Sequence, residues 1–327
     1  MSTPIEPKAV PYPEHDKLGP LGMRTSVVDD PVQLRGALLR AFETATQAAR
    51  DAVAEVDHGS AATAVHDARK ALRRARAVLG LIGSALPKGE RRAVKTALQE
   101  ARRALSTVRD HAVAPDTLAG LALDDADRET ANRVLANAAE AMPPAADIKQ
   151  VLAECAARAA AQAEALQAAL PHEIDWDTVA DGLAATYGEA RHAVGAAKRS
   201  KAWFHTWRRR SKELVYQLDF LAKHAGPRIA AIQSEIAGVT HSLGPAVDLI
   251  MLREFIATYG AGIPADAIAR LRTTLDHNLD ELMKSTRKAA RDTFHAKPKK
   301  LEKRVTKSLR RDLAPPDEGN GASDLQD

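Results

Sequence analysis

The segment AVHDARKALRRAR, residues 64–76, places one histidine and five basic residues in a single stretch of helical sequence. At about 100° per residue, a helix puts Arg69, Lys70 and Arg73 on one face with His66. The opposite face is apolar and carries Val65, Ala68, Ala71, Leu72, Ala75, Val78, Leu79 and Ile82. The segment therefore predicts an amphipathic helix whose polar side is basic and contains a histidine.

A second segment, WFHTWRRRSKELVYQLDF at residues 203–220, repeats this skeleton 139 positions later. Its basic face carries His205, Arg208, Arg209, Lys212 and Tyr216. Trp203 and Trp207 fall on the apolar side, where we expect both to be core residues. Asp110 and Asp248 match at a similar offset, so the chain reads as two duplicated halves. Such duplication predicts two helical bundles related by a pseudo-two-fold axis, with the two basic helices facing each other.

The composition indicates an all-α fold. Hydrophobic residues make up 45% of the chain but aromatic residues only 4%, so the core is built mainly from Ala, Leu and Val. No stretch alternates polar and apolar residues as a strand does. We expect Asp30 and Pro31 to begin the first helix, and Asp175 or Asp177 to cap a later one. The helical patterns cover residues 30–57, 60–83, 89–111, 125–141, 145–169, 176–195, 200–225, 227–241, 245–259, 264–293 and 297–312.

The chain divides into two repeats flanked by tails. We predict a disordered tail over 1–27, a first repeat over 28–144, a second over 145–312 and an acidic disordered tail over 313–327. The single cysteine, Cys155, excludes an intramolecular disulfide and a cysteine zinc cluster, and it fits a reducing compartment. The N-terminus does not read as a signal peptide, and no apolar run approaches the roughly 20 residues of a membrane helix. We expect a cytoplasmic protein that does not enter membranes.

Basic and acidic residues are segregated along the chain. Lys and Arg outnumber Asp and Glu by 12 to 4 in residues 66–110, by 9 to 2 in 195–228 and by 12 to 2 in 284–311, whereas 112–181 has 4 against 13. Like charges three and four apart on a helix repel by a few tenths of a kcal/mol per pair. Binding of a long polyanion is the simplest explanation for basic faces that lack acidic residues, because Arg and Lys bind phosphate oxygens well.

These motifs resemble the CHAD family, the conserved-histidine α-helical domains. The resemblance rests on VHDARKALRRARAVLGLI, FHTWRRRSKELVYQLDFL, VRD at 108–110 and ARDTFHAKPKKLEKR at 290–304, and it covers about residues 30–312. It implies two pseudosymmetric helical bundles around a basic central groove or pore, and binding of inorganic polyphosphate, in some members on polyphosphate granules. Many relatives carry an N-terminal CYTH phosphohydrolase domain, so this chain reads as a stand-alone member.

The predicted polyphosphate-binding residues combine the signature positions with the other basic faces. They are His66, Arg69, Lys70, Arg73, Arg76, Arg92, Lys95, Arg102, Arg103, His205, Arg208, Arg209, Lys212, Tyr216, Lys284, Arg287, Lys288, Arg291, Lys299 and Lys300. The histidines either contact phosphate or hydrogen-bond within the bundle, and both roles are compatible. We expect Asp67 and Glu213 to be ordinary acids on helix surfaces.

Two other function classes compete with polyphosphate binding. A protein that binds nucleic acid usually places aromatic residues among its basic residues. On the basic helix faces predicted here Tyr216 is the one aromatic residue, so we expect no nucleic-acid partner. A phosphohydrolase or phosphotransferase could use the two histidines with Asp110 and Asp248. We expect these aspartates to orient arginines instead, and we predict a protein without enzymatic activity, metal or cofactor, since no paired carboxylates lie near the basic motifs.

Overall fold

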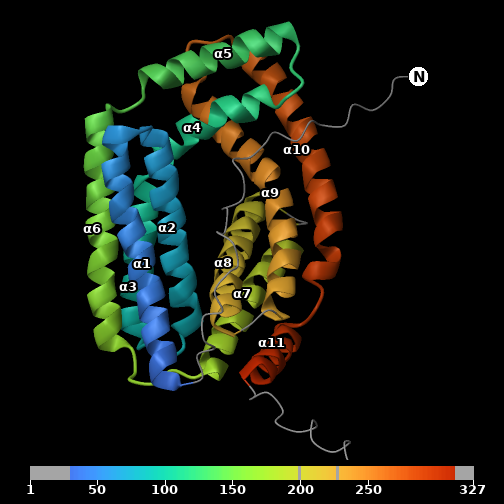
Figure 1. The fold of residues 1–327 in the computed structure, drawn as a ribbon. Helices are drawn as coiled ribbons and strands as arrows, with labels where there is room; N and C mark the ends of the chain where they lie inside the picture. Colours follow the sequence, from blue (N-terminus) through green and yellow to red (C-terminus); the bar gives the residue numbers. More distant parts are fainter. Residues whose placement is uncertain (1–29, 198–199, 226–227, 314–327) are drawn as a thin grey trace, which may run out of the picture.

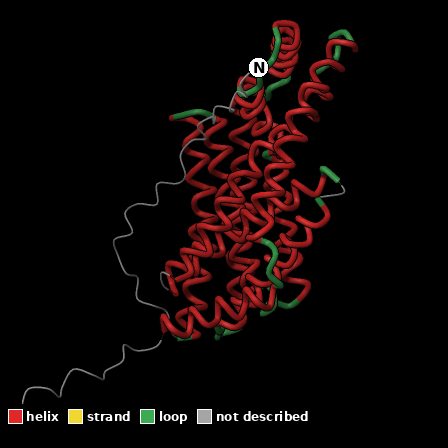
Figure 2. Tube along the Cα trace, turned by 90° about the vertical axis from the view of Figure 1, so that its right-hand side faces the viewer, coloured by secondary structure: helices red, strands yellow, loops and turns green. Residues whose placement is uncertain are grey.

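The computed structural model describes residues 30–197, 200–225 and 228–313, and within those ranges all regular structure is α-helical (Figure 2). The helices are α1 (Pro31–His58), α2 (Ala61–Ile82), α3 (Lys88–Ala104), α4 (Ser106–Ala119), α5 (Asp125–Glu140), α6 (Ala145–Ala169), α7 (Trp176–Ala196), α8 (Ala202–Ala225), α9 (Arg228–Tyr259), α10 (Ala265–Thr293) and α11 (Pro298–Leu313). The predicted all-α fold is confirmed. The predicted tail over 1–27 lies outside the described residues, and so does 313–327 except for Leu313, the last residue of α11.

Two groups of helices stand side by side, and α4 and α5 lie across one end (Figure 1). The first group is α1, α2, α3 and α6; the second contains α7, α8 and α9, with α10 packed on α9 and α11 on α7. Helix α6 was assigned by sequence to the second repeat, yet it packs against α1 and α3. The packing thus places α6 in the first group, while the predicted boundary between the repeats at residue 144 stays a prediction. The pseudo-two-fold relation of the halves stays a prediction.

Local sequence sets the helix ends as expected at two places. Asp30 caps α1 by accepting a hydrogen bond from the Gln33 amide at 2.8 Å, and Pro31 is the first helical residue. Of the two candidate caps for α7, the structure selects Asp175, whose carboxylate accepts from the Thr178 amide at 2.7 Å.

Two expected helices differ from the structure. The segment predicted as one helix over 89–111 breaks at Leu105, beside which the Ser106 hydroxyl donates to the Arg103 carbonyl at 2.6 Å. The segments predicted over 227–241 and 245–259 form one helix, α9, although residue 227 lies outside the described part. Pro245 inside α9 lacks an amide donor, and the neighbouring turn is supported from α10, where Thr286 donates to the Ser242 carbonyl.

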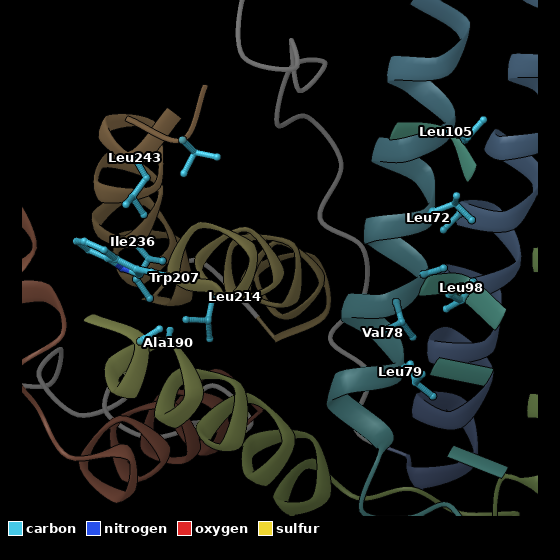
Figure 3. Packing of buried hydrophobic residues seen from close by; sticks show 14 of the residues in the cluster. Leu72, Val78, Leu79, Leu98, Leu105, Ala190, Trp207, Leu214, Ile236 and Leu243 are labelled. Atoms are coloured by element: carbon cyan, nitrogen blue, oxygen red, sulfur yellow. The ribbon is translucent and has the colours of Figure 1, made fainter. Parts of the chain in front are cut away.

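One core of mainly small aliphatic side chains joins both groups of helices. Figure 3 shows Leu72, Val78 and Leu98 on one side, and the largest buried side chain, Trp207, on the other. The prediction that Trp203 is a core residue was wrong. Trp203 lies at the start of α8 and is 36% exposed, and its ring packs edge-on against His192 of α7. None of the helices in the described ranges is both long and apolar enough to cross a membrane.

The end of α2 meets α7 and α8 at a close backbone contact. A Cβ atom added to Gly182 of α7 would lie 2.3 Å from the Leu81 carbonyl oxygen of α2. Next to it, the Gln217 amide of α8 donates to the Ala77 carbonyl and to the Thr186 hydroxyl, each at 3.1 Å. Because this backbone contact leaves no room for a side chain at residue 182, it sets how closely α2 and α7 approach each other.

We predict that Gly182→Ala lowers the free energy of unfolding by about 1–3 kcal/mol, because the added methyl group clashes with backbone that cannot move away cheaply. Gly195→Ala in the same helix is the matched control, since nothing lies within 4 Å of its Cβ position. The control is expected to be neutral or to stabilise by about 0.5–1 kcal/mol. Urea denaturation followed by circular dichroism measures both, and equal stabilities of the two variants would contradict the prediction.

Candidate anion-binding site

Helices from both groups bring a set of arginines together. We call this set the arginine cluster; it consists of Arg69, Arg73 and Arg76 on α2, Arg102 on α3, Arg109 on α4, and Arg208 and Arg209 on α8. Helix α2 is the centre of the arrangement, because it packs against α3, α4 and α8. The two basic segments of the sequence thus lie next to each other in space.

The pKa values of these arginines show that they act on one another. Burial, followed by the charges of Arg73, Arg102 and Arg109, lowers the pKa of Arg69 to about 9. Burial also lowers the pKa of Arg102 to about 10, with contributions from Arg76, Arg73 and Arg209. The repulsion therefore crosses from the first basic segment to the second. A site of this kind favours any ligand that brings negative charge.

A buried glutamate holds two arginines of this region in place. Glu213 on α8, which is 5% exposed, forms ion pairs with Arg76 and Arg210, and Arg210 also pairs with Glu189 on α7. The prediction that Glu213 is an ordinary surface acid was wrong, whereas Asp67 is indeed exposed. Arg76, predicted to bind ligand, is itself buried against this carboxylate. Its charge is therefore used to join α2 to α8.

Two aspartates hold a third arginine. Arg109 donates to Asp110 at 3.0 Å and to Asp248 of α9 at 2.8 Å, which ties α4 to α9. The structure thus places Asp110 and Asp248 as partners of an arginine, as expected from the sequence. In the described part of the chain, the His, Cys, Asp and Glu side chains form no group of three that could hold a metal ion.

The other members of the arginine cluster retain unused hydrogen-bond donors. No ion pair within the described residues joins Arg69, Arg73, Arg102, Arg208 or Arg209 to a carboxylate. Arg69 donates to the Arg102 carbonyl at 2.8 Å, but its Nε is buried without a partner, as are the Nε atoms of Arg102, Arg208 and Arg209. Buried donors are nearly always paired in proteins. Four such donors lie together in this cluster.

Tyr216 connects α8 to the arginines of α2. It interacts with the guanidinium of Arg73, and the guanidinium of Arg74 lies over its ring, 5.6 Å from the ring centre. Tyr216 thus orders two arginines across the boundary between the halves, a role that its place on the basic face did not reveal. Lys70 and Lys212 are half-buried on the same helices.

The two signature histidines flank the arginine cluster near Arg109. Burial lowers the pKa of His66 below its ordinary value of 6.5; the carboxylate of Asp67 opposes this shift, and the charges of Arg73, Lys70 and Arg109 add to it. Burial likewise lowers the pKa of His205, where Glu254 opposes the shift and Arg208 adds to it. Both side chains therefore favour the neutral form until negative charge arrives.

Several predicted residues lie apart from the arginine cluster. Arg92, Lys95 and Arg103 are exposed on α3, Lys284, Lys288 and Arg291 on α10, and Lys299 and Lys300 on α11. Arg287 is half-buried: it donates to the Ala197 carbonyl at 2.6 Å and lies 5.2 Å from the ring centre of Phe204. Arg287 therefore anchors α10 to α7 and α8. Sequence reasoning passed over Arg109, although the VRD motif contains it.

Fold and site define an all-helical domain with a cationic centre shared by its two halves. The family model of the CHAD domain matches residues 40–257, which is most of the chain, so the chain belongs to the CHAD domain family. Its fold is also similar to the crystal structure of the CHAD domain from the plant Ricinus communis, with a TM-score of 0.61, 17% sequence identity, and coverage of 84% of this chain and 95% of that one. No curated protein matches the sequence.

We predict that Glu213→Gln lowers the free energy of unfolding by about 3 kcal/mol or more, because two arginines lose a buried counter-charge. Glu100→Gln is the matched control, since its ion pair with Arg158 is about half exposed on both sides. That control is expected to cost less than about 1 kcal/mol. Chemical denaturation measures the free energy of unfolding of both variants. A loss for Glu213→Gln no larger than that for the control would refute a structural role for the ion pairs of Glu213.

Proposed function

We propose that the chain binds inorganic polyphosphate through the arginine cluster. The observation that carries the proposal is the set of buried Nε donors on Arg69, Arg102, Arg208 and Arg209, which lack partners in the described structure. Phosphate oxygens accept hydrogen bonds from guanidinium groups in a planar, often bidentate geometry. A polymer of phosphates supplies many such oxygens and neutralises repulsion that the protein leaves uncompensated. Membership of the CHAD family is consistent with this ligand.

The aromatic content of the site favours polyphosphate over nucleic acid. Proteins that bind single strands stack bases on accessible aromatic rings. At the arginine cluster the ring of Tyr216 is covered by Arg74, and its side chain interacts with Arg73. Trp203 is the exposed aromatic residue of α8, but its ring packs against His192 of α7. A ligand without bases needs no such rings.

We propose binding without chemical turnover. The two aspartates nearest the arginine cluster, Asp110 and Asp248, already accept hydrogen bonds from Arg109, which supports a positioning role. A polymer much longer than the site would carry several copies of the protein at once. The protein would therefore collect on polyphosphate granules in the cytoplasm and help to organise them.

The test removes two arginines that form no ion pair with a carboxylate in the described residues, one from each basic segment, as Arg73→Gln with Arg208→Gln. Charge-assisted hydrogen bonds contribute about 1.5–3 kcal/mol each, so the double variant is expected to bind long-chain polyphosphate roughly 100-fold more weakly or worse. Arg40→Gln with Arg50→Gln removes the same charge from exposed positions on α1 and is expected to change affinity little. Calorimetric titration measures both, and circular dichroism checks that both variants are folded.

Unchanged affinity in the folded Arg73 and Arg208 variant would refute the site. Competition between polyphosphate and single-stranded DNA separates the two ligand classes. It is measured at several salt concentrations, because the binding of either polyanion weakens as salt is added. A preference for DNA at every salt concentration would reject the proposed ligand, and phosphate release during the titration would reject binding without turnover.

Binding is expected to strengthen as the pH falls. In the free protein the pKa values of His66 and His205 lie below 6.5. A bound polyanion raises them, so binding takes up protons and affinity rises from about pH 7.5 to about pH 5.5. His66→Gln with His205→Gln is expected to flatten this dependence, whereas His277→Gln, exposed on α10, is expected to retain it. Titrations across this range in buffers of different ionisation enthalpy measure the uptake; a flat profile for the unaltered protein would contradict it.

A further inference from the structure

A second basic surface lies on α10 and α11, outside the arginine cluster. We call it the outer basic face; it consists of Lys284, Lys288 and Arg291 on α10 and Lys299, Lys300, Lys303, Arg304 and Lys307 on α11. All eight side chains are exposed, and within the described residues none of them forms an ion pair. Helix α11 is amphipathic, with Leu301, Val305 and Leu309 buried on its other side. Its charged side is thus turned fully to solvent.

The outer basic face is held rigidly rather than carried on a loose end. The Tyr187 hydroxyl of α7 hydrogen-bonds to the carbonyls of Thr293 and Ala296, at 3.0 and 3.2 Å, in the turn between α10 and α11. Phe294 in this turn is buried and stacks on the Tyr187 ring, with ring centres 5.6 Å apart. The lysines of α11 therefore keep a fixed place relative to α7.

Buried aromatic residues separate the outer basic face from the arginine cluster. Phe294 lies edge-on to Trp207 of α8, and Trp207 packs against Phe204, with ring centres 6.2 and 5.4 Å apart. The arginines of α8 that adjoin Trp207 in sequence interact with α2 and α3 on the opposite side. Helices α10 and α11 pack mainly on α9, α5 and α7. A straight segment of polymer in the arginine cluster therefore cannot reach the outer basic face through the protein.

We infer that the outer basic face binds a second, separate segment of polyphosphate, so that one protein molecule cross-links polymer chains. The inference rests on the proposed function and adds to it a bivalent mode of binding. Exposed lysines act as point charges without fixed geometry, which suits a flexible polymer of high charge density. Two binding surfaces on one rigid body raise the apparent affinity for a long polymer without adding contacts for a short one. Such cross-linking would condense polymer and protein into one phase.

The experiment compares two variants that each lose three charges: Lys288→Gln, Lys300→Gln and Lys303→Gln on the outer basic face, against Arg40→Gln, Arg50→Gln and Lys88→Gln on the first group of helices. Light scattering is followed while long-chain polyphosphate is added. The unaltered protein and the control variant are expected to scatter strongly near charge equivalence and to clear with excess polymer. The outer-face variant is expected to stay clear, because it holds one segment at a time.

Calorimetric titration with tripolyphosphate distinguishes failure of the outer basic face from failure of the proposed function of the arginine cluster. All three proteins are expected to bind this short ligand within about twofold of one another, since it occupies the arginine cluster alone. Scattering by the outer-face variant equal to that of the control would overturn the inference and leave the proposed function standing. Failure of the unaltered protein to bind either ligand would overturn both. Stronger scattering with single-stranded DNA than with polyphosphate would assign the outer basic face to nucleic acid and overturn the inference.

Discussion

Repulsion among like charges is the constraint that the rest of this structure must meet. Burial, and after it the charges of neighbouring arginines, lower the pKa values of Arg69, Arg73 and Arg102, and the acids nearby compensate only part of the charge. The arrangement persists because other contacts hold α2 against α7 and α8. The backbone contact at Gly182 and the hydrogen bonds of Gln217 lie at the same junction. The apolar core thus holds in place a cluster that would otherwise separate.

The few acids near the arginine cluster are placed to orient arginines and not to neutralise the site. Glu213 joins α2 to α8 through Arg76, and its second partner, Arg210, continues the network to Glu189 on α7. Asp110 and Asp248 hold Arg109 from two sides. Arg109 and Arg76, fixed in this way, adjoin arginines without acidic partners, Arg69 and Arg102. Under the proposed function, a ligand would meet donors whose directions are already set, which would lower the entropy lost on binding.

Helical spacing predicted the fold and the two basic helices because it depends on residues three and four apart in one segment. The same spacing could have identified Glu213, which follows Arg209 by four positions and so lies on the basic face. It could not show that this carboxylate is buried, because burial depends on α2, which lies far away in the sequence. The continuous α9 was missed for a related reason: the contact from Thr286 to Ser242 that supports α9 is tertiary. The exposure of Trp203 likewise depends on how the first turn of α8 packs against α7, which spacing within α8 does not reveal.

The two basic surfaces differ in composition, and the difference follows from their environments. The basic residues around the arginine cluster are mostly arginine, with Lys70 and Lys212 half-buried on the same helices, whereas the outer basic face is mostly lysine. An ammonium group is strongly hydrated and costs more to bury than a guanidinium group, whose charge is delocalised and whose donors have fixed directions. Arginine therefore suits a partly buried site where geometry matters, and lysine suits an exposed surface where only the density of charge matters. Under the proposed function, one polymer chemistry would satisfy both surfaces, because phosphate oxygens would serve as directed acceptors in the first and as a line of charge on the second.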